Sequence, residues 1–343
     1  MQLIQQNIET TERPLCYLCG TKGVILYANL SDRLYHTSGL WSIYKCPKCE
    51  LLWLNPAPKE TELWKTYVNY YTHQTSKPPQ SLIRMVFMDT KNAYISDKYG
   101  YKIPHSLIGK ILSKIIYLYP ARRADFDFSV FFLKPIKNGK ILDVGCGSGI
   151  FIENMANLGW NAEGIDFDKS AILNALSRNL KVSLGDLKSK NFESNYFDVI
   201  TLSHVIEHVS NPIDLLKECF RILKENGRLM IATPNNKSLA HKIYKISWFP
   251  LEPPRHLFIF NPQNLIQIAK LAGFKKINVR TSIRGSAGIF IESKDIKKFG
   301  HYDVNKKKKI LENIKARFME YLEWFTIKFN KNAGEEIILS SEK

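Results

Sequence analysis

Four of the six cysteines lie within the first fifty residues, at a spacing typical of metal ligands. Cys16 and Cys19 form one C-x-x-C pair, Cys46 and Cys49 form another, and 26 residues separate the two pairs. Two such pairs can place four thiolates tetrahedrally around Zn²⁺, and four protein ligands leave no open position, so we expect a structural zinc ion. The alternative is disulfides. We do not expect them, because residues 1–13 are polar, lack the apolar core of a secretory signal and indicate a cytoplasmic chain.

A glycine-rich turn is the second group suited to ligand binding. Gly145, Gly147 and Gly149 follow the apolar run 140–144, and residues 150–158 then have helical character. Glycine adopts positive φ without strain and lets the backbone approach a ligand closely. The first turn of the following helix has free N–H groups. The pattern predicts a cofactor site at the junction of strand and helix.

Three carboxylates lie at the ends of the strands around this turn. Asp143 precedes the glycines, Asp166 follows Gly145 by 21 residues at the end of the next strand, and Asp186 ends the third. A nicotinamide dehydrogenase shares the layout. The G-x-G-x-G spacing and the acid on the first strand favour S-adenosylmethionine instead. Asp166 is positioned to bind a ribose diol, and Asp186 to accept a hydrogen bond from an adenine amine. For Asp143, support of the turn and direct cofactor contact both remain open.

His204, Glu207 and His208 occupy positions i, i+3 and i+4, so a helix would place them on one face after the fourth strand. His204 or His208 could serve as general base for O-methylation, because histidine titrates near neutral pH. A second hypothesis makes the three residues a divalent-metal site. The third is hydrogen bonding within the start of a helix.

The proline-rich loop 253–257 supplies two further candidates. Arg255 could clamp a phosphate or carboxylate, and His256 could act as a base. Proline stiffens such a loop. The alternative is a surface loop in which His256 bonds to the backbone. The expected place of the loop over the cofactor rim favours a functional role.

From residue 139 onward, patterns typical of strands and of helices alternate, which predicts βαβ units and an α/β fold. Such a fold would bring these side chains together. We expect strands at 140–144, 162–165, 182–184, 197–202, 228–233, 276–282 and 336–340. We expect helices at 150–158, 170–179, 213–223, 262–272 and 305–328, the last after the basic run 306–309.

Basic, helical segments flank this central region. The chain has a net charge of +17. Residues 76–138 hold eleven Lys or Arg against four Asp or Glu (+7), and residues 238–343 hold twenty against ten (+10). Residues 106–119 repeat apolar side chains at helical spacing with lysines opposite. We expect that stripe to pack on its own domain. The alternative is a helix lying on a membrane surface, and no apolar run is long enough to span a bilayer.

Residues 139–293 resemble the class I S-adenosylmethionine-dependent methyltransferases. The matching runs are 142–149 (LDVGCGSG), 197–202 (FDVITL), 205–209 (VIEHV), 221–229 (RILKENGRL) and 232–235 (ATPN). The resemblance implies a Rossmann-like, seven-stranded, mostly parallel sheet with flanking helices, whose last strand, 336–340, is antiparallel. It also implies these cofactor contacts: Asp143, Gly145, Gly147, Gly149, Asp166, Phe167, Asp186, Leu187, Ser203 and His204.

Two further resemblances bear on the acceptor. The stretch around His204 is similar to ubiquinone-pathway O-methyltransferases, but it has a histidine where an acid is expected. Residues 44–56 resemble the zinc ribbon that precedes many bacterial methyltransferases of glycan and secondary-metabolite pathways. We therefore expect a zinc-ribbon-like module at 1–75, a helical linker or lid at 76–138, and a methyltransferase domain at 139–343 with a helical insertion at about 294–331.

The leading hypothesis is O-methylation of a sugar or glycan precursor or another small molecule, with an anionic acceptor included. An RNA methyltransferase is the alternative suggested by the zinc module and the charge. Against it, residues 1–75 carry a net charge of only +1, and Ser203-His204-Val205 replaces a base-methylation motif of the Asn-Pro-Pro-Tyr type. A catalytically inactive, cofactor-binding scaffold is the third hypothesis. The sequence does not indicate an oligomeric state.

Overall fold

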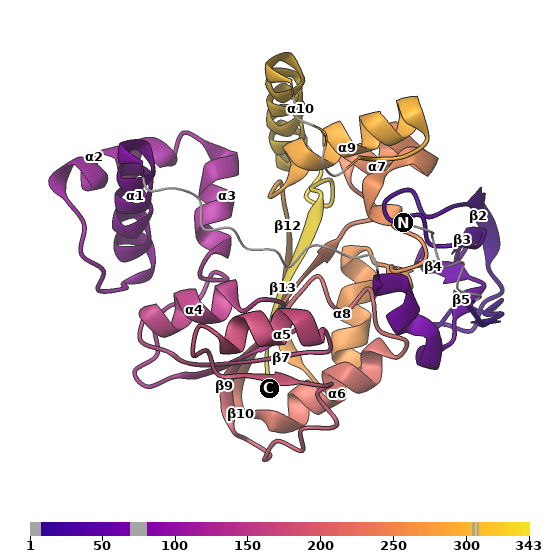
Figure 1. Cartoon of the computed structure of the whole chain (residues 1–343), viewed down its shortest axis with the longest axis horizontal. Helices are drawn as coiled ribbons and strands as arrows, with labels where there is room; N and C mark the ends of the chain where they lie inside the picture. Colours follow the sequence, from indigo (N-terminus) through magenta and orange to yellow (C-terminus); the bar gives the residue numbers. More distant parts are fainter. Residues whose placement is uncertain (1–7, 69–80, 304–305, 307–308) are drawn as a thin grey trace.

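The computed structural model describes residues 8–68, 81–303, 306 and 309–343. A twisted sheet forms the centre of the molecule (Figure 1). Helices cover both of its faces, the N-terminal module lies at one end, and a pair of helices projects at the other end. The expected domain boundary at 75/76 lies outside the described residues.

The central sheet has seven strands in the order β12-β13-β10-β9-β6-β7-β8. Only β13 runs antiparallel to its two neighbours, and the remaining pairs are parallel. The predicted α/β fold with an antiparallel last strand is confirmed. The strands are β6 (Lys140–Val144), β7 (Asn161–Asp166), β8 (Val182–Leu184), β9 (Phe197–Ser203), β10 (Leu223–Pro234), β12 (Lys275–Ser282) and β13 (Glu336–Glu342).

Alternation along the strands divides the core in two. Side chains of successive strand residues point to opposite faces, so Ile141 and Val199 join one buried cluster, and Leu142 and Ile200 join the other. Residues of α1, α3 and α4 complete the first cluster, while residues of α6 and α8 complete the second. The helices are α1 (Leu82–Tyr99), α2 (Leu107–Ile116), α3 (Pro120–Phe128), α4 (Ile150–Asn157), α5 (Lys169–Leu176), α6 (Pro212–Ile222), α7 (Leu239–Tyr244), α8 (Pro262–Leu271), α9 (Ser286–Phe299) and α10 (Ile310–Phe329).

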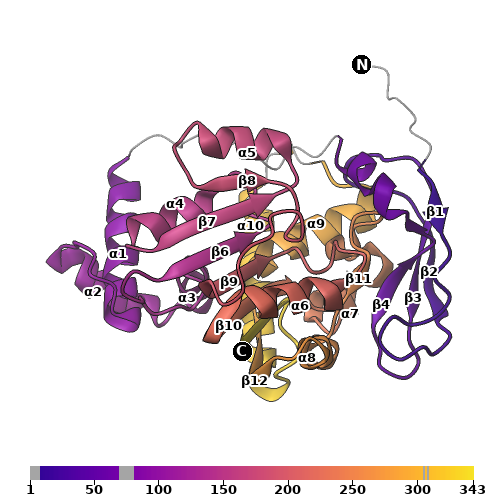
Figure 2. The same ribbon diagram turned by 90° about the horizontal axis from the view of Figure 1, so that it is seen from below.

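The N-terminal module is built into the main domain by a shared sheet. It consists of β1 (Thr10–Thr11), β2 (Val24–Leu30), β3 (Trp41–Lys45), β4 (Leu52–Asn55), β5 (Ala57–Pro58) and the 3-10 helix η1 (Glu60–Tyr67). Strand β11 (Phe258–Ile259), from the loop before α8, pairs antiparallel with β4 and extends the module's sheet to four strands. Figure 2 shows the module at the end of the molecule opposite α2. Because the module and the sheet also share one buried cluster, they form a continuous core.

Most of the apolar stripe of residues 106–119 faces solvent, so the expectation that it packs on its own domain was wrong for these residues, while Ile116 packs against the core. Leu107, Ile108 and Ile111 are 73%, 64% and 58% exposed. The buried side of α2 carries Gly109 and Ser113 instead. Periodicity identified the residues that share a face. It could not show that the small residues opposite form the contact with α1. None of the described helices is both long and apolar enough to cross a membrane.

Candidate functional site

The glycine turn between β6 and α4 has a backbone that only glycine adopts easily. Gly145, Gly147 and Gly149 have φ angles of 74°, 51° and 76°. A Cβ at Gly145 would lie 2.3 Å from Cγ2 of Val205, which follows β9. The stretch after β9 therefore lies directly against the turn, and no side chain fits between them. This packing requires a glycine at position 145, and the positive φ angles of the three glycines give the turn the shape of a cradle in which a cofactor can approach the backbone.

Asp166 ends β7 beside this turn and is bonded to its backbone. Its Oδ2 accepts from the Gly147 N–H at 2.8 Å, and its Oδ1 accepts from the Asp168 N–H at 2.8 Å. Asp186 lies exposed after β8, where its Oδ1 accepts from the Ser189 N–H at 2.7 Å. Parallel strands β6, β7 and β8 bring the glycines and both acids to one edge of the sheet, as expected for a cofactor that spans it.

Of the neighbouring predicted contacts, Phe167 is 57% exposed and Leu187 is 3% exposed. Asp143 is buried, and its Oδ1 accepts from the Thr201 hydroxyl at 2.6 Å. Burial raises the pKa of Asp143 to about 7. This bond joins β6 to β9 beneath the turn, which favours the supporting role over direct cofactor contact.

His204 adopts a left-handed backbone (φ 54°) immediately after β9. Its Nδ1 lies 3.3 Å from Oε1 of Glu207, and its Nε2 lies 2.9 Å from Oε1 of Glu336 on β13. Although burial opposes charge, these two carboxylates raise the pKa of His204 to about 9. An imidazole that is protonated at neutral pH cannot accept a proton, so this environment does not suit His204 as a base.

Glu336 links His204 to further groups at the rim. The guanidinium of Arg284 donates to both oxygens of Glu336, with its Nε 2.9 Å from Oε2. It also lies over the ring of Phe128 from α3, at 3.5 Å from the centroid. Helix α3, the ends of β9 and β13 and the loop after β12 therefore meet at one place beside the glycine turn.

His208 differs from His204 in charge and partners. Its Nδ1 lies 3.1 Å from the carbonyl oxygen of Arg255, which can only accept, so Nδ1 carries the proton. The Tyr67 hydroxyl from the N-terminal module lies 2.9 Å from the same nitrogen. Burial lowers the pKa of His208 to about 4. His208 is thus neutral at physiological pH, with the lone pair on Nε2.

Arg255 is fully buried and does not face the rim. Its guanidinium forms two hydrogen bonds of 2.7 and 2.8 Å with the carboxylate of Asp32 in the N-terminal module. It donates a third, of 2.8 Å, to Glu252. With its donors bound to these carboxylates it cannot clamp an acceptor anion. Its role here is to join the module to the main domain.

His256 is 5% exposed. Its Nδ1 lies 2.7 Å from the carbonyl oxygen of Pro250, and its Nε2 lies 3.6 Å from Glu252. These contacts match the alternative in which His256 forms hydrogen bonds with the backbone of its own loop.

A metal could be bound by a different trio from the one the sequence indicated. One ligand atom each of Glu207, His208 and His256 lies within 4.8 Å of the others. His204 is replaced in this set by His256, which comes from a loop about fifty residues away. Glu207 is fully buried, and although burial opposes its charge, the neighbouring His204 lowers the pKa of Glu207 to about 2. The trio therefore has one charged and one neutral ligand in place for a divalent ion.

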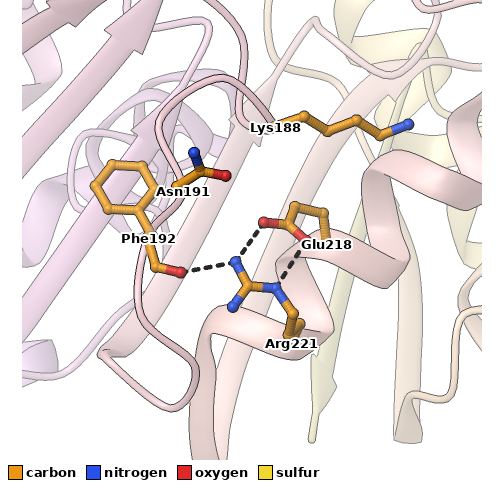
Figure 3. A pocket seen from close by; sticks show the side chains of 5 residues that line it. All are labelled: Lys188, Asn191, Phe192, Glu218 and Arg221. Atoms are coloured by element: carbon orange, nitrogen blue, oxygen red, sulfur yellow. Dashed lines mark hydrogen bonds and ion pairs between the residues drawn. The ribbon is translucent and has the colours of Figure 1, made fainter.

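A surface pocket of about 420 Å³ lies beside the connection from β8 to β9 (Figure 3). Its lining residues are Lys188, Asn191, Phe192, Glu218 and Arg221. Arg221 is bonded within the wall, to Glu218 at 2.6 Å and to the Phe192 carbonyl at 2.7 Å. None of the predicted site residues lines it, so we do not assign the cofactor or the acceptor to this pocket.

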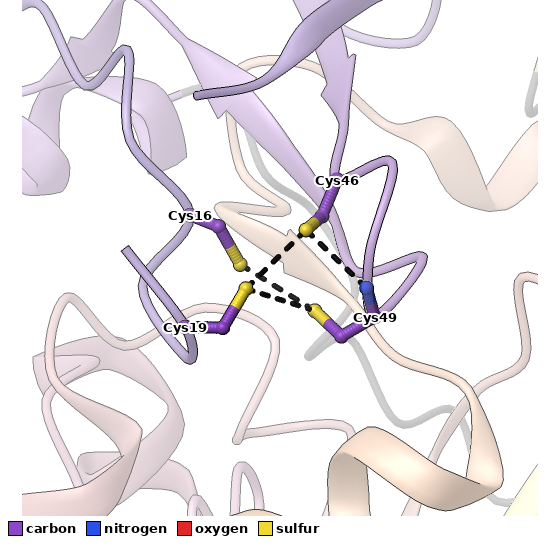
Figure 4. Close-up of side chains that lie close together, drawn as sticks. All are labelled: Cys16, Cys19, Cys46 and Cys49. Carbon is purple, nitrogen blue, oxygen red and sulfur yellow. Dashed lines mark hydrogen bonds between the residues drawn. The ribbon is translucent and has the colours of Figure 1, made fainter. Parts of the chain in front are cut away.

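The four N-terminal cysteines converge with sulfur atoms facing one another (Figure 4). Three Sγ–Sγ distances are 3.5, 3.4 and 3.9 Å, for Cys16–Cys49, Cys19–Cys46 and Cys19–Cys49. Zn–S bonds of about 2.3 Å in a tetrahedron require sulfur atoms about 3.8 Å apart. Burial raises the pKa of the Cys16 thiol to about 11 and raises that of Cys49 as well, so a divalent cation is needed to hold these two groups as thiolates. The donor set fits structural zinc.

The zinc knuckle also contacts the main domain directly. The carbonyl oxygen of Cys49 accepts from Asn261 at 3.2 Å and from Asn264 at 2.9 Å, both at the start of α8. The Glu50 carbonyl accepts from Asn236 at 3.0 Å. The second knuckle is therefore anchored to the loops that surround β11.

Sequence reasoning missed several residues of the rim. Tyr67, Phe128, Arg284 and Glu336 lie far from the recognised motifs in the chain. Glu336 at the start of β13 meets His204 just after the end of β9, although 132 residues separate them in the chain. For Glu336 the sequence indicated only that it begins the predicted last strand, 336–340, and not that this strand brings it to His204.

Comparisons with known proteins agree with this geometry. Residues 120–279, slightly less than half of the chain, match a family model described as a methyltransferase domain. The ubiquinone biosynthesis O-methyltransferase of Glaesserella parasuis is 36% identical over 115 residues, which cover 30% of this chain and 49% of that protein. The enzyme of the same name from Pelagibacter ubique is 34% identical over 151 residues, 40% of this chain and 62% of that protein. The chain thus spans only about half to three fifths of these curated relatives.

Among solved structures, an S-adenosylmethionine-dependent methyltransferase from Archaeoglobus fulgidus matches 73% of this chain and 99% of its own. The two chains are 20% identical, and the TM-score is 0.41. Residues 120–279, which include the glycine turn, thus match a methyltransferase domain. The predictions of a methyltransferase and of S-adenosylmethionine as its cofactor are confirmed.

Proposed function

We propose that the chain is an S-adenosylmethionine-dependent O-methyltransferase that acts on the hydroxyl group of a small molecule. The observation that supports this most is the glycine cradle beneath Val205, with Asp166 beside it at the end of β7. O-methylation is the activity in the names of the curated relatives. We take only this chemistry from them, because the chain spans part of their length.

The residues of the chain have separable tasks in such a reaction. When bound, S-adenosylmethionine supplies a methyl group on a sulfonium sulfur. The turn and Asp166 hold and orient the cofactor, and positioning accounts for most of the rate in a direct displacement. A hydroxyl acceptor must lose one proton. Of the three candidate histidines, His208 is both partly exposed and neutral at physiological pH, so we assign it as the proton acceptor, and its lowered pKa makes it a weaker base than a free imidazole.

His204 and Arg284 have a positioning role in this scheme. Both are charged, and both contact Glu336. Their charges are balanced by Glu207 and Glu336, so the rim presents paired charges and the Phe128 ring and no strong positive field. A neutral, hydroxyl-rich acceptor fits such a rim, and we propose a sugar or glycan precursor as the first class to test.

The test is transfer of radiolabelled methyl from S-adenosylmethionine into separated pools of glycan, small metabolites, lipid and RNA. Label in the glycan or metabolite pool supports the proposal. Label that ribonuclease releases overturns it in favour of the RNA alternative. No label in any pool, with cofactor binding intact, would favour the inactive scaffold.

His208→Gln tests the assigned base. It should lower kcat by about 10² to 10⁴-fold while cofactor affinity stays unchanged. The matched control is His105→Gln, an exposed histidine before α2. A kcat of His208→Gln equal to that of the control would remove His208 from this role.

A further inference from the structure

The hairpin of α1 and α2 has an unusually large exposed apolar surface. On α2 and the residues after it, five large apolar side chains are each more than half exposed, and six more on the first two turns of α1 are between 38% and 83% exposed. They are Leu107, Ile108, Ile111, Ile115 and Leu118, and Leu82, Ile83, Met85, Val86, Phe87 and Met88. Exposed apolar side chains in such number on two packed helices are typical of an interaction site. The hairpin lies outside residues 120–279, so the methyltransferase match does not account for it.

The packing of the hairpin fixes this surface toward solvent. Ser106 caps α2, and its N–H bonds to Asp89 of α1 at 2.8 Å. Gly109 is the contact point, because a Cβ there would lie 2.3 Å from Oδ2 of Asp89. Lys114 forms an ion pair of 2.7 Å with Asp97. Rotating α2 to bury its isoleucines would break these contacts and push larger side chains into a space shaped for glycine and serine.

The charge around this surface is positive. Residues 82–116 hold six Lys or Arg and two Asp or Glu. Both acids are engaged within the hairpin, Asp89 with Ser106 and Asp97 with Lys114. Lys102 and Lys110 are exposed beside the apolar residues. A second copy of the chain on this face would bring like charges together. An anionic bilayer surface supplies both an apolar phase and negative headgroups.

Among the described residues, the hairpin stands at the edge of the molecule. It projects from one end of the molecule, opposite the N-terminal module (Figures 1 and 2). Helix α10 projects from the same upper side in Figure 1, and its residues Ile310, Ile314 and Phe318 are 80%, 60% and 69% exposed. Tyr321 of α10 stacks on Tyr119, at the start of α3, at 6.1 Å, which connects the two apolar regions. We infer that the α1–α2 hairpin is a peripheral anchor that lays its apolar face into the surface of an anionic membrane.

The experiment is flotation of the full chain with vesicles of phosphatidylcholine alone or mixed with phosphatidylglycerol. We expect the wild type to float with the anionic vesicles and to be released in part by salt. The double variant Ile108→Gln/Ile111→Gln should bind at least about tenfold more weakly, because two exposed side chains no longer enter the apolar layer. Lys110→Gln should weaken binding to anionic vesicles only.

The matched control is Leu173→Gln/Leu271→Gln, on α5 and α8, where the leucines are 57% and 52% exposed. Circular dichroism and cofactor binding check that both double variants are folded. Absence of flotation by the wild type, or equal flotation by both double variants, would overturn the inference. So would a dimer in sedimentation that Ile108→Gln/Ile111→Gln dissociates, since a second copy would then occupy the face.

Discussion

Asp32→Asn should weaken the contact that joins the N-terminal module to the methyltransferase domain, and so lower the free energy of unfolding. Asp32 is 3% exposed and forms two hydrogen bonds with Arg255, which is fully buried. Although burial opposes its charge, Arg255 lowers the pKa of Asp32 from 3.8 to about 2. At about 1.4 kcal/mol for each pKa unit, the charged form contributes about 2 kcal/mol to the free energy of unfolding.

The loss in the variant should exceed that contribution. Asparagine keeps the shape but leaves Arg255 with Glu252 as its remaining carboxylate in this pair network. Breaking a buried ion pair typically costs about 3 to 5 kcal/mol, because one charge remains uncompensated. We therefore expect the free energy of unfolding to fall by about 3 kcal/mol. The stability that Asp32 contributes is present above its unfolded pKa of 3.8 and is lost as the pH falls through about 2.

Urea denaturation followed by tryptophan fluorescence measures this, since Trp41 and Trp53 report on the module and Trp248 on the main domain. The control Glu9→Gln breaks an exposed pair with Lys59 and should cost less than about 1 kcal/mol. In a double-mutant cycle with Arg255→Met, the combined loss should be smaller than the sum of the single losses. A change within about 0.5 kcal/mol for Asp32→Asn would refute the argument that this pair joins the two parts.

Three further predictions follow from the zinc module, the rim and the turn. Cys49→Ser should lose the one zinc ion bound per chain, as measured by atomic emission, whereas Cys219→Ser, at a buried position of α6, should retain it. Zinc retained by both variants would exclude the four-cysteine site. By NMR, His204 should titrate near pH 9 and His208 near pH 4. The stability that protonated His204 contributes is present below pH 6.5 and is lost as the pH rises through about 9. A midpoint of His204 near 6.5 would contradict its pairing with two carboxylates. Gly145→Ala should weaken binding of S-adenosylhomocysteine at least about tenfold in calorimetry, because the turn requires φ of 74° and has no room for a Cβ, and unchanged affinity would show that the turn is not the cradle.

The sequence predicted the parallel part of the fold well because periodicity and turn residues are local signals. Strands 140–144 and 182–184 were predicted with the bounds observed. The site was predicted less completely. The role of Arg255 depends on Asp32, 223 residues away, and the charge of His204 depends on Glu336, 132 residues away. Such pairings are set by tertiary packing and leave no pattern in the local sequence.

The orientation of α2 was missed for a related reason. Its periodicity gives an apolar face and a face with small residues, but either can be the buried one. Gly109 and Ser113 allow close approach to α1, and this contact determined the outcome. The strand at 336–340 was predicted from its residues, but its antiparallel direction was predicted only through the family resemblance, since no local pattern gives the direction of a strand.

The most direct test of the central claim is calorimetric binding of S-adenosylmethionine to the wild type, Asp166→Ala and the control Asp214→Ala, a partly exposed acid on α6. Each hydrogen bond to a charged group contributes about 1.5 to 3 kcal/mol, so losing those of Asp166 should weaken binding by about ten to a hundredfold or more. We predict one cofactor bound per chain, with that loss for Asp166→Ala and none for Asp214→Ala. Absence of binding to the wild type, or equal affinity of the two variants, would contradict the assignment of the glycine turn and Asp166 as the cofactor site.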